Sequence, residues 1–349
     1  MDHKRPLHHP DVHAPASDWS ENETLHVAAV YSNPFRWRTR RQLANDFRHH
    51  MRHLPNVDLH FVELAYGDRP WDIANPELYP NDIALRTAHE LFHKENLLNI
   101  AIQRFPANWK YGAVIDADFH FSRHDIALET IQQLQHYEFV QMFSAYTDLS
   151  GGHYGHAHRP VGHNNGAAYN YVMKGMPAGF GQGGWKTGAG SDGGYGGGHV
   201  GATGGAWAFR RSAFNTVGGM LDRCILGHGD WFMFFGLIGE EAPDMHSSQY
   251  SPEYMSYIHA WQQRAARLTK NIGYVDGHAT HHWHGPKVRR GYSSRDKILV
   301  EHQYSPVTDV HTDWQGILQL TPAKPRLRDA IRRYFISRSE DIPYIPDEG

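Results

Sequence analysis

With 349 residues, the chain is long enough for two domains or for one large α/β domain, and its 40% hydrophobic content excludes wholesale disorder. A formal net charge of −3, from 34 Lys and Arg against 37 Asp and Glu, excludes a uniformly basic protein that binds nucleic acid or a membrane surface. The single cysteine, Cys224, excludes an intramolecular disulfide and indicates a reducing compartment, while 28 histidines point to a metal site and also raise the chance of false metal motifs.

The first half of the chain alternates apolar runs with amphipathic stretches. Residues 1–24 are polar, and we expect them to form a disordered leader that is not a secretory signal. No apolar run approaches the ~20 residues of a membrane span. The pattern predicts strands at residues 25–31, 57–64, 111–115 and 139–146, and helices at residues 39–51, 87–105 and 124–135. This α/β alternation predicts a mostly parallel sheet flanked by helices, with ligands at the carboxyl ends of its strands.

A glycine-rich stretch then interrupts the pattern. Residues 151–206 hold 20 of the 34 glycines and few segments that suit a strand or a helix, and a loop of this length is usually functional. After it, we expect strands at residues 206–210 and 272–275 and helices at residues 211–217, 230–238, 252–268 and 327–336. We therefore expect one domain over residues 25–320, followed by a C-terminal helix and tail at residues 321–349.

Two carboxylates follow the predicted strand at residues 111–115. Asp116 and Asp118 are separated by one residue, so both can reach a divalent cation at the carboxyl edge of the sheet. Oxygen ligands suit Mg²⁺ or Mn²⁺, which commonly complete their shell with substrate phosphate oxygens. The alternative is an exposed turn or a helix cap, where aspartate is also favoured.

A histidine cluster and a basic segment follow the predicted strand at residues 272–275. His284 is the preferred ligand beside the two aspartates, and His282 is the second choice. The cations that follow, including Lys287 and Arg290, would hold a diphosphate. The alternative is that these histidines are solvated or hydrogen-bonded, as most are.

A competing motif lies at residues 89–93. His89, Glu90 and His93 form H-E-x-x-H on a predicted helix, which is the arrangement of a zinc hydrolase. In a chain this rich in histidine, roughly 0.1 such matches are expected by chance, so the motif is weaker evidence than usual.

Several segments, in order, resemble the β-1,4-galactosyltransferase type of GT-A glycosyltransferase, whose fold is Rossmann-like. Residues 33–38 (N-P-F-R-W-R) resemble its P-F-R-x-R segment, residues 62–68 its V-I-E-Q-x-x-D segment, and residues 92–99 its F-N-R-A-K-L-L-N segment. Residues 116–118 match its D-x-D motif. Residues 204–209 are similar to its F-G-G-V strand, and residues 226–230 stand where it has W-G-W-G-G-E-D. The chain departs from that pattern by having one acidic residue in the last segment and by its glycine-rich insert.

The resemblance implies a metal-dependent transfer of a sugar from a nucleotide sugar, expected to be a UDP-sugar, to an acceptor hydroxyl. It assigns the metal to Asp116, Asp118 and His284, with Mn²⁺ or Mg²⁺ as the cofactor. The nucleotide sugar is expected to contact the following residues: Pro34, Arg36, Arg38, Glu63, Lys94, Asp116, Lys287 and Arg290. A basic helix start at Arg36 and Arg38, or a solvated lysine at position 94, is the simpler alternative for three of these.

The acceptor side is expected beyond the glycine-rich stretch. Asp230 follows a glycine-flanked turn and is either a helix cap or the general base that deprotonates the acceptor, which implies inversion. Trp185 lies in the presumed lid over residues 151–206, and Gly205, Trp207 and Trp231 are assigned to the acceptor region.

Three alternatives stay open from the sequence. The first is the zinc hydrolase, and the second is a non-catalytic protein that binds a nucleotide sugar or a glycan. The third concerns the acceptor, which is a glycan, a protein or a hydroxymethylated DNA base. We expect no membrane partner and a cytoplasmic location, in the host cytoplasm if the chain is encoded by a phage.

Overall fold

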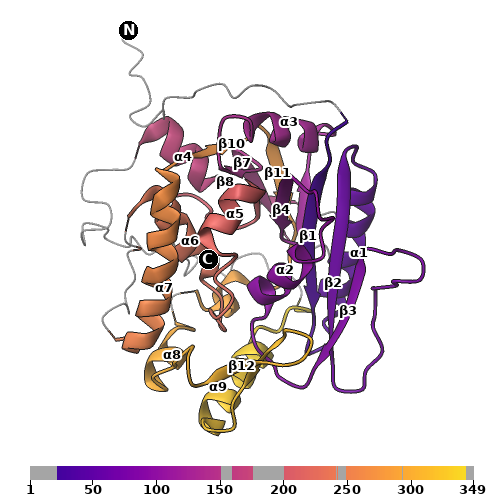
Figure 1. Ribbon diagram of the computed structural model, residues 1–349. Coiled ribbons are helices and arrows are strands. Elements are labelled where there is room, and N and C mark those ends of the chain that lie inside the picture. The colour runs from indigo at the N-terminus through magenta and orange to yellow at the C-terminus, as the bar shows by residue number, and fades with distance from the viewer. Residues whose placement is uncertain are drawn as a thin grey trace.

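The computed structural model describes residues 22–150, 159–175, 200–240, 242, 249–292 and 294–342 (Figure 1). A seven-stranded sheet in the order β10-β6-β9-β4-β1-β2-β3 forms its centre. Its strands are β1 (Leu25–Ser32), β2 (Val57–Tyr66), β3 (Asp82–Thr87), β4 (Tyr111–Ile115), β6 (Phe139–Gln141), β9 (Ala206–Arg210) and β10 (Ile272–Tyr274). Only β9 runs antiparallel to its neighbours β4 and β6, so the mostly parallel α/β sheet predicted from the sequence is confirmed.

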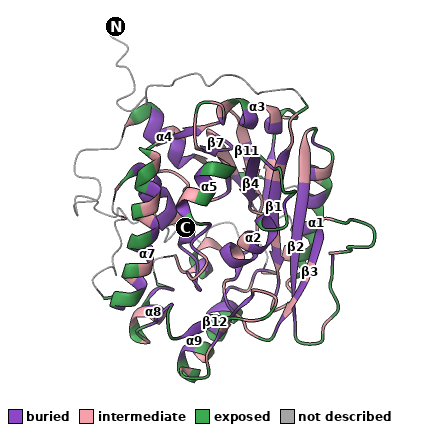
Figure 2. Cartoon of the chain, viewed as in Figure 1, coloured by how far each residue is buried: buried purple, intermediate pink, exposed green. Residues whose placement is uncertain are grey.

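Helices cover both faces of this sheet because its strands are apolar on both sides. In β1, Val27 and Ala29 belong to one buried cluster, whereas Ala28 belongs to the other. The first cluster is covered by α1 (Arg38–Arg52) and α3 (Ile126–Gln133). The second is covered by α2 (Lys94–Ile102), α4 (Ala167–Lys174), α5 (Arg211–Val217), α6 (Gly229–Ile238), α7 (Pro252–Ala265), α8 (Lys297–Glu301) and α9 (Pro325–Ser337). Figure 2 shows the strands mostly buried and the outer face of α7 exposed.

Shorter elements complete the described part of the chain. A four-stranded sheet runs in the order β5-β11-β7-β8, and β12 pairs with β13 as a separate hairpin. The strands of these sheets are β5 (Phe119–Phe121), β7 (Ala145–Leu149), β8 (Pro160–Asn165), β11 (His278–His281), β12 (Val310–Thr312) and β13 (Leu318–Leu320). Two short 3-10 helices are η1 (Ala266–Leu268) and η2 (Lys287–Arg290). Within the described ranges, no helix combines the length and apolarity needed to cross a bilayer.

The helix predicted at residues 87–105 was wrong in its first part. Thr87 ends β3, which pairs in parallel with β2, and α2 begins only at Lys94. Between them, the Phe92 N–H donates to the Ile225 carbonyl at 3.0 Å. Strand pairing at Thr87 and this contact with a distant part of the chain therefore override the local helical pattern.

One further expectation was wrong in the middle of the chain. The single strand predicted at residues 139–146 is divided between β6 in the large sheet and β7 in the smaller one. In the described part of the stretch 151–206, where few regular segments were expected, the structure places β8 and α4. Helix α4 ends at Gly175, whose φ of 67° is readily adopted only without a side chain.

Candidate functional site

A cleft of about 220 Å³ opens where β1 and β4 end. The chain leaves β1 at Ser32 and β4 at Ile115, so the segments that follow these two strands meet at one edge of the sheet. The ionisable residues that line the cleft come from both halves of the chain: Tyr31, Arg40, His93, Lys94, Glu95, Asp116, Asp118, His228, Asp230, His281, His284, Arg290, Tyr292, Arg295, Arg338 and Glu340.

Asp116 and Asp118 sit on a tight turn between β4 and β5. The Asp116 N–H donates to the Gly205 carbonyl at 2.7 Å, and the Phe119 N–H donates to the Asp116 carbonyl at 3.0 Å. The Asp116 carboxylate pairs with Lys94 Nζ at 2.5 Å. Burial raises the pKa of Asp116 and Lys94 opposes that rise, so this carboxylate is held by a lysine rather than by the histidines.

Asp118, His281 and His284 form a group whose ligand atoms all lie within 4.8 Å of one another. Asp118 Oδ2 lies 3.2 Å from His284 Nε2, and Asp118 Oδ1 lies 3.8 Å from His281 Nε2. Strand β11 delivers His281, because it pairs with β5 in a register that sets His281 opposite Phe119. Two imidazoles and a carboxylate are donors that a divalent transition metal accepts.

The environment of this group prepares its atoms for a cation. Among the described atoms, Asp118 Oδ1 is buried without a hydrogen-bond partner. Burial, followed by the charge of Arg290, holds the pKa of His284 well below its ordinary value, so its ring is neutral. His281 Nδ1 lies 2.6 Å from Asp148 Oδ1, and a proton on Nδ1 leaves the lone pair of Nε2 facing Asp118.

Asp148 supports His281 from the far side. Burial alone would raise the pKa of Asp148. The hydrogen bonds from His281 and Lys287 outweigh burial and bring this pKa down to about 2. Lys287 Nζ lies 2.7 Å from Asp148 Oδ2 and is not among the residues lining the cleft. His282, the second choice of ligand, donates its backbone N–H to the Asp118 carbonyl at 2.9 Å, while its ring lies 4.3 Å from the ring of His120.

Asp230 lies near the start of α6 and lines the cleft. It also lines a second, smaller cavity with Trp207 and Gly205. The backbone of Gly204 approaches it so closely that a Cβ at this position would stand 2.5 Å from Asp230 Oδ2. Two carboxylates, Asp230 and Asp116, therefore share one glycine-lined wall.

Glu95 is a buried carboxylate beside Asp230 that the sequence reasoning missed. It is 3% exposed, and its side chain packs against Gly229, the residue before Asp230. The pKa of Glu95 is raised to about 7. Burial is the main cause, the charge of Lys94 opposes the rise, and the charge of Asp230 adds to it. A buried carboxyl group with a pKa of about 7 is suited to proton transfer near neutral pH.

Arginines line the remaining side of the cleft. Arg40 donates to Glu340 through Nε at 2.8 Å and Nη2 at 2.6 Å, and Arg338 pairs with the same carboxylate at 2.9 Å. Arg290 and Arg295 are buried, their hydrogen bonds of 3.3–3.5 Å are long, and their Nε atoms lack partners among the described residues. Both residues line the cleft, and both guanidiniums keep a donor without a partner among the described residues.

The other residues predicted to bind the nucleotide are dispersed. Pro34 lines the cleft, whereas Arg36 and Arg38 are exposed and do not; Arg40 lies there instead. Glu63 is buried and accepts three backbone N–H groups of residues 72–74 at 2.5–2.8 Å.

The predicted acceptor residues divide between the small cavity and its surroundings. Trp207 donates its indole N–H to the Thr203 carbonyl at 2.8 Å, and Gly205 has a φ of 93° with no room for a Cβ against Phe119. Trp231 packs on Phe235 and does not line the small cavity. Trp185 lies outside the described residues.

The H-E-x-x-H motif does not form a zinc site, and its helical placement was wrong. His89 and Glu90 precede α2, so the motif is not on one helix. His93 is buried with Nε2 at 2.9 Å from the Leu318 carbonyl, and Glu90 pairs with Arg332. In the described part of the chain, these residues belong to no group of clustered metal ligands. Each one holds the β12–β13 region or α9 in place instead.

The residues missed from the sequence are His281, Glu95, Arg40 and Glu340. Arg40 lies only two positions after Arg38, the second arginine that the P-F-R-x-R segment predicted to bind the nucleotide. The alternation of β11 would have favoured His281 over His282 if that strand had been recognised. Glu340 had no local signal, because it acts through contacts 300 residues apart in the chain.

No protein-family model and no curated protein matches this chain. Among solved structures, the chain is similar to a variant of Drosophila β-1,4-galactosyltransferase 7 in complex with manganese, UDP-Gal and xylobiose, at 13% identity over 88% of this chain and 98% of that one, with a TM-score of 0.37. The catalytic domain of the same Drosophila enzyme with xylobiose gives 15% identity over 88% and 98%, with a TM-score of 0.35. A protein of Desulfovibrio desulfuricans described as a nucleotide-diphospho-sugar transferase gives 14% identity over 89% and 98%, with a TM-score of 0.32.

Proposed function

We propose that this chain is a metal-dependent glycosyltransferase that moves a sugar from a UDP-sugar to an acceptor hydroxyl with inversion. The observation that carries the proposal is the cleft itself. It sets the ligand group of Asp118, His281 and His284 beside two buried arginines with unused donors. A cation site next to fixed positive charge is what a bound diphosphate requires.

The donor set fits a divalent cation, with Mn²⁺ favoured over Mg²⁺. The partnerless Asp118 Oδ1 supplies an unsatisfied negative charge, and the two imidazoles supply nitrogen ligands. Nitrogen donors are more compatible with Mn²⁺ than with Mg²⁺, which prefers an all-oxygen shell. When bound, the metal would neutralise negative charge on the departing diphosphate.

The chain's own cations hold the nucleotide end of the donor. Arg290 and Arg295 donate from their buried guanidiniums to phosphate oxygens. Lys94 lies 2.5 Å from Asp116, and this pair fixes the lysine at the boundary between the cation site and Asp230. Fixed donors of this kind stabilise developing charge without reorganising during the reaction.

Asp230 acts as the general base. The acceptor oxygen forms a bond to the anomeric carbon while the bond from that carbon to the diphosphate oxygen breaks, and the acceptor proton passes to the Asp230 carboxylate. A single displacement of this kind inverts the anomeric centre. The Gly204 wall admits the carboxylate because no side chain stands there.

The small cavity behind Asp230 has a volume of only about 30 Å³, so the acceptor would reach Asp230 from the larger cleft, which this residue also lines. We favour a glycan acceptor because sugars pack on aromatic side chains, and Phe35 and Trp37 line that cleft. A protein acceptor or a hydroxymethylated base remains as an outcome of the acceptor screen.

Metal-coupled nucleotide binding tests the proposal. We expect Mn²⁺ to tighten UDP binding by at least tenfold in calorimetric titrations of the full chain. Asp118→Asn should abolish that increase, whereas Asp329→Asn, an exposed and distant aspartate, should retain it. Equal UDP affinity with and without Mn²⁺ in the unaltered chain would refute the metal-dependent site.

A further inference from the structure

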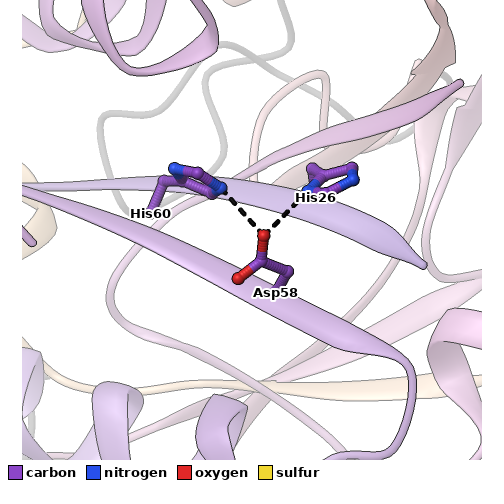
Figure 3. Close-up of side chains that lie close together, drawn as sticks. All are labelled: His26, Asp58 and His60. Atoms are coloured by element: carbon purple, nitrogen blue, oxygen red, sulfur yellow. Dashed lines mark hydrogen bonds and ion pairs between the residues drawn. The ribbon is translucent and has the colours of Figure 1, made fainter. Parts of the chain in front are cut away.

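A second group of metal-type ligands lies at the opposite edge of the large sheet. The His–Asp–His cluster consists of His26 on β1 and of Asp58 and His60 on β2 (Figure 3). The parallel register pairs His26 with Asp58, and His60 follows two residues later on the same face. His26 Nδ1 lies 2.9 Å and His60 Nε2 lies 3.0 Å from a single oxygen, Asp58 Oδ2. The backbone register alone thus brings three ligand atoms to one point.

The surroundings fix all three side chains. The ring of Phe105 lies 5.4 Å from the His26 ring and 4.6 Å from the His60 ring, so it holds both imidazoles against the sheet. Asn81 donates to the other carboxylate oxygen, Asp58 Oδ1, at 2.6 Å. An amide that orients a carboxylate while its second oxygen faces two imidazoles is the outer contact typical of metal sites.

The charge of Asp58 has no permanent counterion. Of the ion pairs between described residues, none joins Asp58 to a lysine or an arginine. A half-buried carboxylate that faces two imidazoles and no lysine or arginine is electrostatically suited to a cation.

The distances are close to those of a tetrahedral zinc site. Zinc-to-nitrogen and zinc-to-oxygen bonds of about 2.0–2.2 Å place neighbouring ligand atoms roughly 3.4 Å apart. The observed separations of 2.9 and 3.0 Å need to widen by only about 0.4 Å. The Asp58 side chain is 31% exposed, which gives the fourth position access to water.

We propose that His26, Asp58 and His60 bind Zn²⁺, with water as the fourth ligand, and that this ion fastens β1 to β2. His26 lies six residues before the end of β1, which corresponds to about 20 Å along the strand. The site is therefore separate from the cleft at the carboxyl edge and does not depend on the function proposed for that cleft.

Cobalt and zinc titrations of the full chain test the site. Asp118→Asn serves as the background, because it weakens the other ligand group. In this background we expect one equivalent of Co²⁺ with the intense visible bands of tetrahedral coordination, and a rise in Tm of several degrees with Zn²⁺. Adding Asp58→Asn should weaken Co²⁺ binding at least 100-fold and remove the Tm shift. Adding Asp46→Asn, an exposed aspartate on α1, should change neither.

The titrations distinguish a metal site from a His–Asp–His cluster that is held only by hydrogen bonds. Absence of tetrahedral bands and of a zinc-induced Tm shift in the Asp118→Asn background overturns the proposal. Co²⁺ binding that survives Asp58→Asn also overturns it, since the histidines elsewhere, including those of residues 1–21, are common to all variants. If Asp58→Asn fails to give a native far-UV spectrum, His26→Gln at the edge of the cluster replaces it and carries the same expectation.

Discussion

Gly204 shows how a missing side chain shapes the proposed catalytic wall. A Cβ there would lie 2.5 Å from Asp230 Oδ2, a distance that forces the carboxylate to move. No positive φ is involved at this position, so the backbone itself tolerates alanine. The role of Gly204 is therefore to leave room for the base.

Gly204→Ala is expected to lower kcat by at least tenfold while leaving the fold intact. A displacement of about 1 Å in a catalytic group commonly costs on the order of 100-fold in rate. Steady-state kinetics with the accepted donor would measure it, beside a thermal melt. Gly162→Ala is the matched control, because its Cβ meets Asp148 at an ordinary 3.4 Å. Equal kcat in the two variants would show that Asp230 does not need this space.

At the scale of elements, α1 is tied to the end of the described chain. Its first residues have no side-chain cap from Trp37, and the N–H groups of Arg38 and Thr39 instead donate to the Asp341 carboxylate, both at 2.9 Å. The adjacent Glu340 holds Arg40 on the same helix. A carboxylate at the amino end of a helix accepts hydrogen bonds from the free N–H groups there, and its negative charge interacts favourably with the positive end of the helix dipole.

Asp341→Ala is expected to reduce the free energy of unfolding by about 1 kcal/mol, the usual effect of losing a helix cap. Urea denaturation at neutral pH would measure the change. Asp329→Ala on α9 serves as the comparison, because among the described residues Asp329 forms an ion pair only with the exposed neighbouring Arg328. A loss no greater than that of Asp329→Ala would mean that Asp341 does not cap α1.

The elements that could be predicted were those whose local pattern and tertiary role agree. Strands β1 and β4 are continuous apolar runs buried on both faces, and the strand positions near residues 25 and 111 followed from that alone. Strand β3 was missed because an edge strand carries less apolar sequence, and its pairing with β2 is not a local property. The helical pattern of residues 87–93 failed for the same reason.

The site residues that could be predicted are likewise those that a local sequence pattern marks. Asp116 and Asp118 were identified because they directly follow a recognisable strand, and His284 lies 3.2 Å from Asp118 as the ligand hypothesis required. His281 was missed because its position depends on the antiparallel pairing of β11 with β5. Glu95 was missed because only burial distinguishes it from an ordinary helix-face glutamate.

At the scale of the whole molecule, partial or full burial lowers the pKa of several histidines. Burial is the largest cause that lowers the pKa of each of the following: His50, His89, His93, His120, His278 and His284. The pKa of His93 falls from 6.5 to about 4. Part of the histidine excess therefore serves packing and hydrogen bonding rather than metal binding.

These histidines predict loss of stability in mild acid. Below pH 6.5 the unfolded chain takes up protons that the folded chain refuses until its lower pKa is reached, so the free energy of unfolding falls as the pH drops toward 4. Glu95 acts in the opposite direction, since its pKa is raised to about 7. For His93 alone the expected loss is about 2 kcal/mol at pH 5.

Urea denaturation of His93→Gln at pH 7.5 and pH 5 isolates that contribution. The stability difference between the two pH values should shrink by about 2 kcal/mol relative to the unaltered chain. His259→Gln, an exposed residue on α7, should leave the difference unchanged. A His93→Gln variant with the full pH dependence would show that His93 is not held neutral.

Turnover of nucleotide sugars tests the central claim most directly. The full chain with Mn²⁺ is incubated with a panel of UDP-sugars, with and without glycan acceptors, and released nucleoside diphosphate is measured. We predict release from at least one donor that is abolished by chelation and reduced at least 100-fold by Asp118→Asn but not by Asp329→Asn. Tight UDP binding without any release above the Asp118→Asn level would contradict transfer and identify a non-catalytic nucleotide-sugar binder.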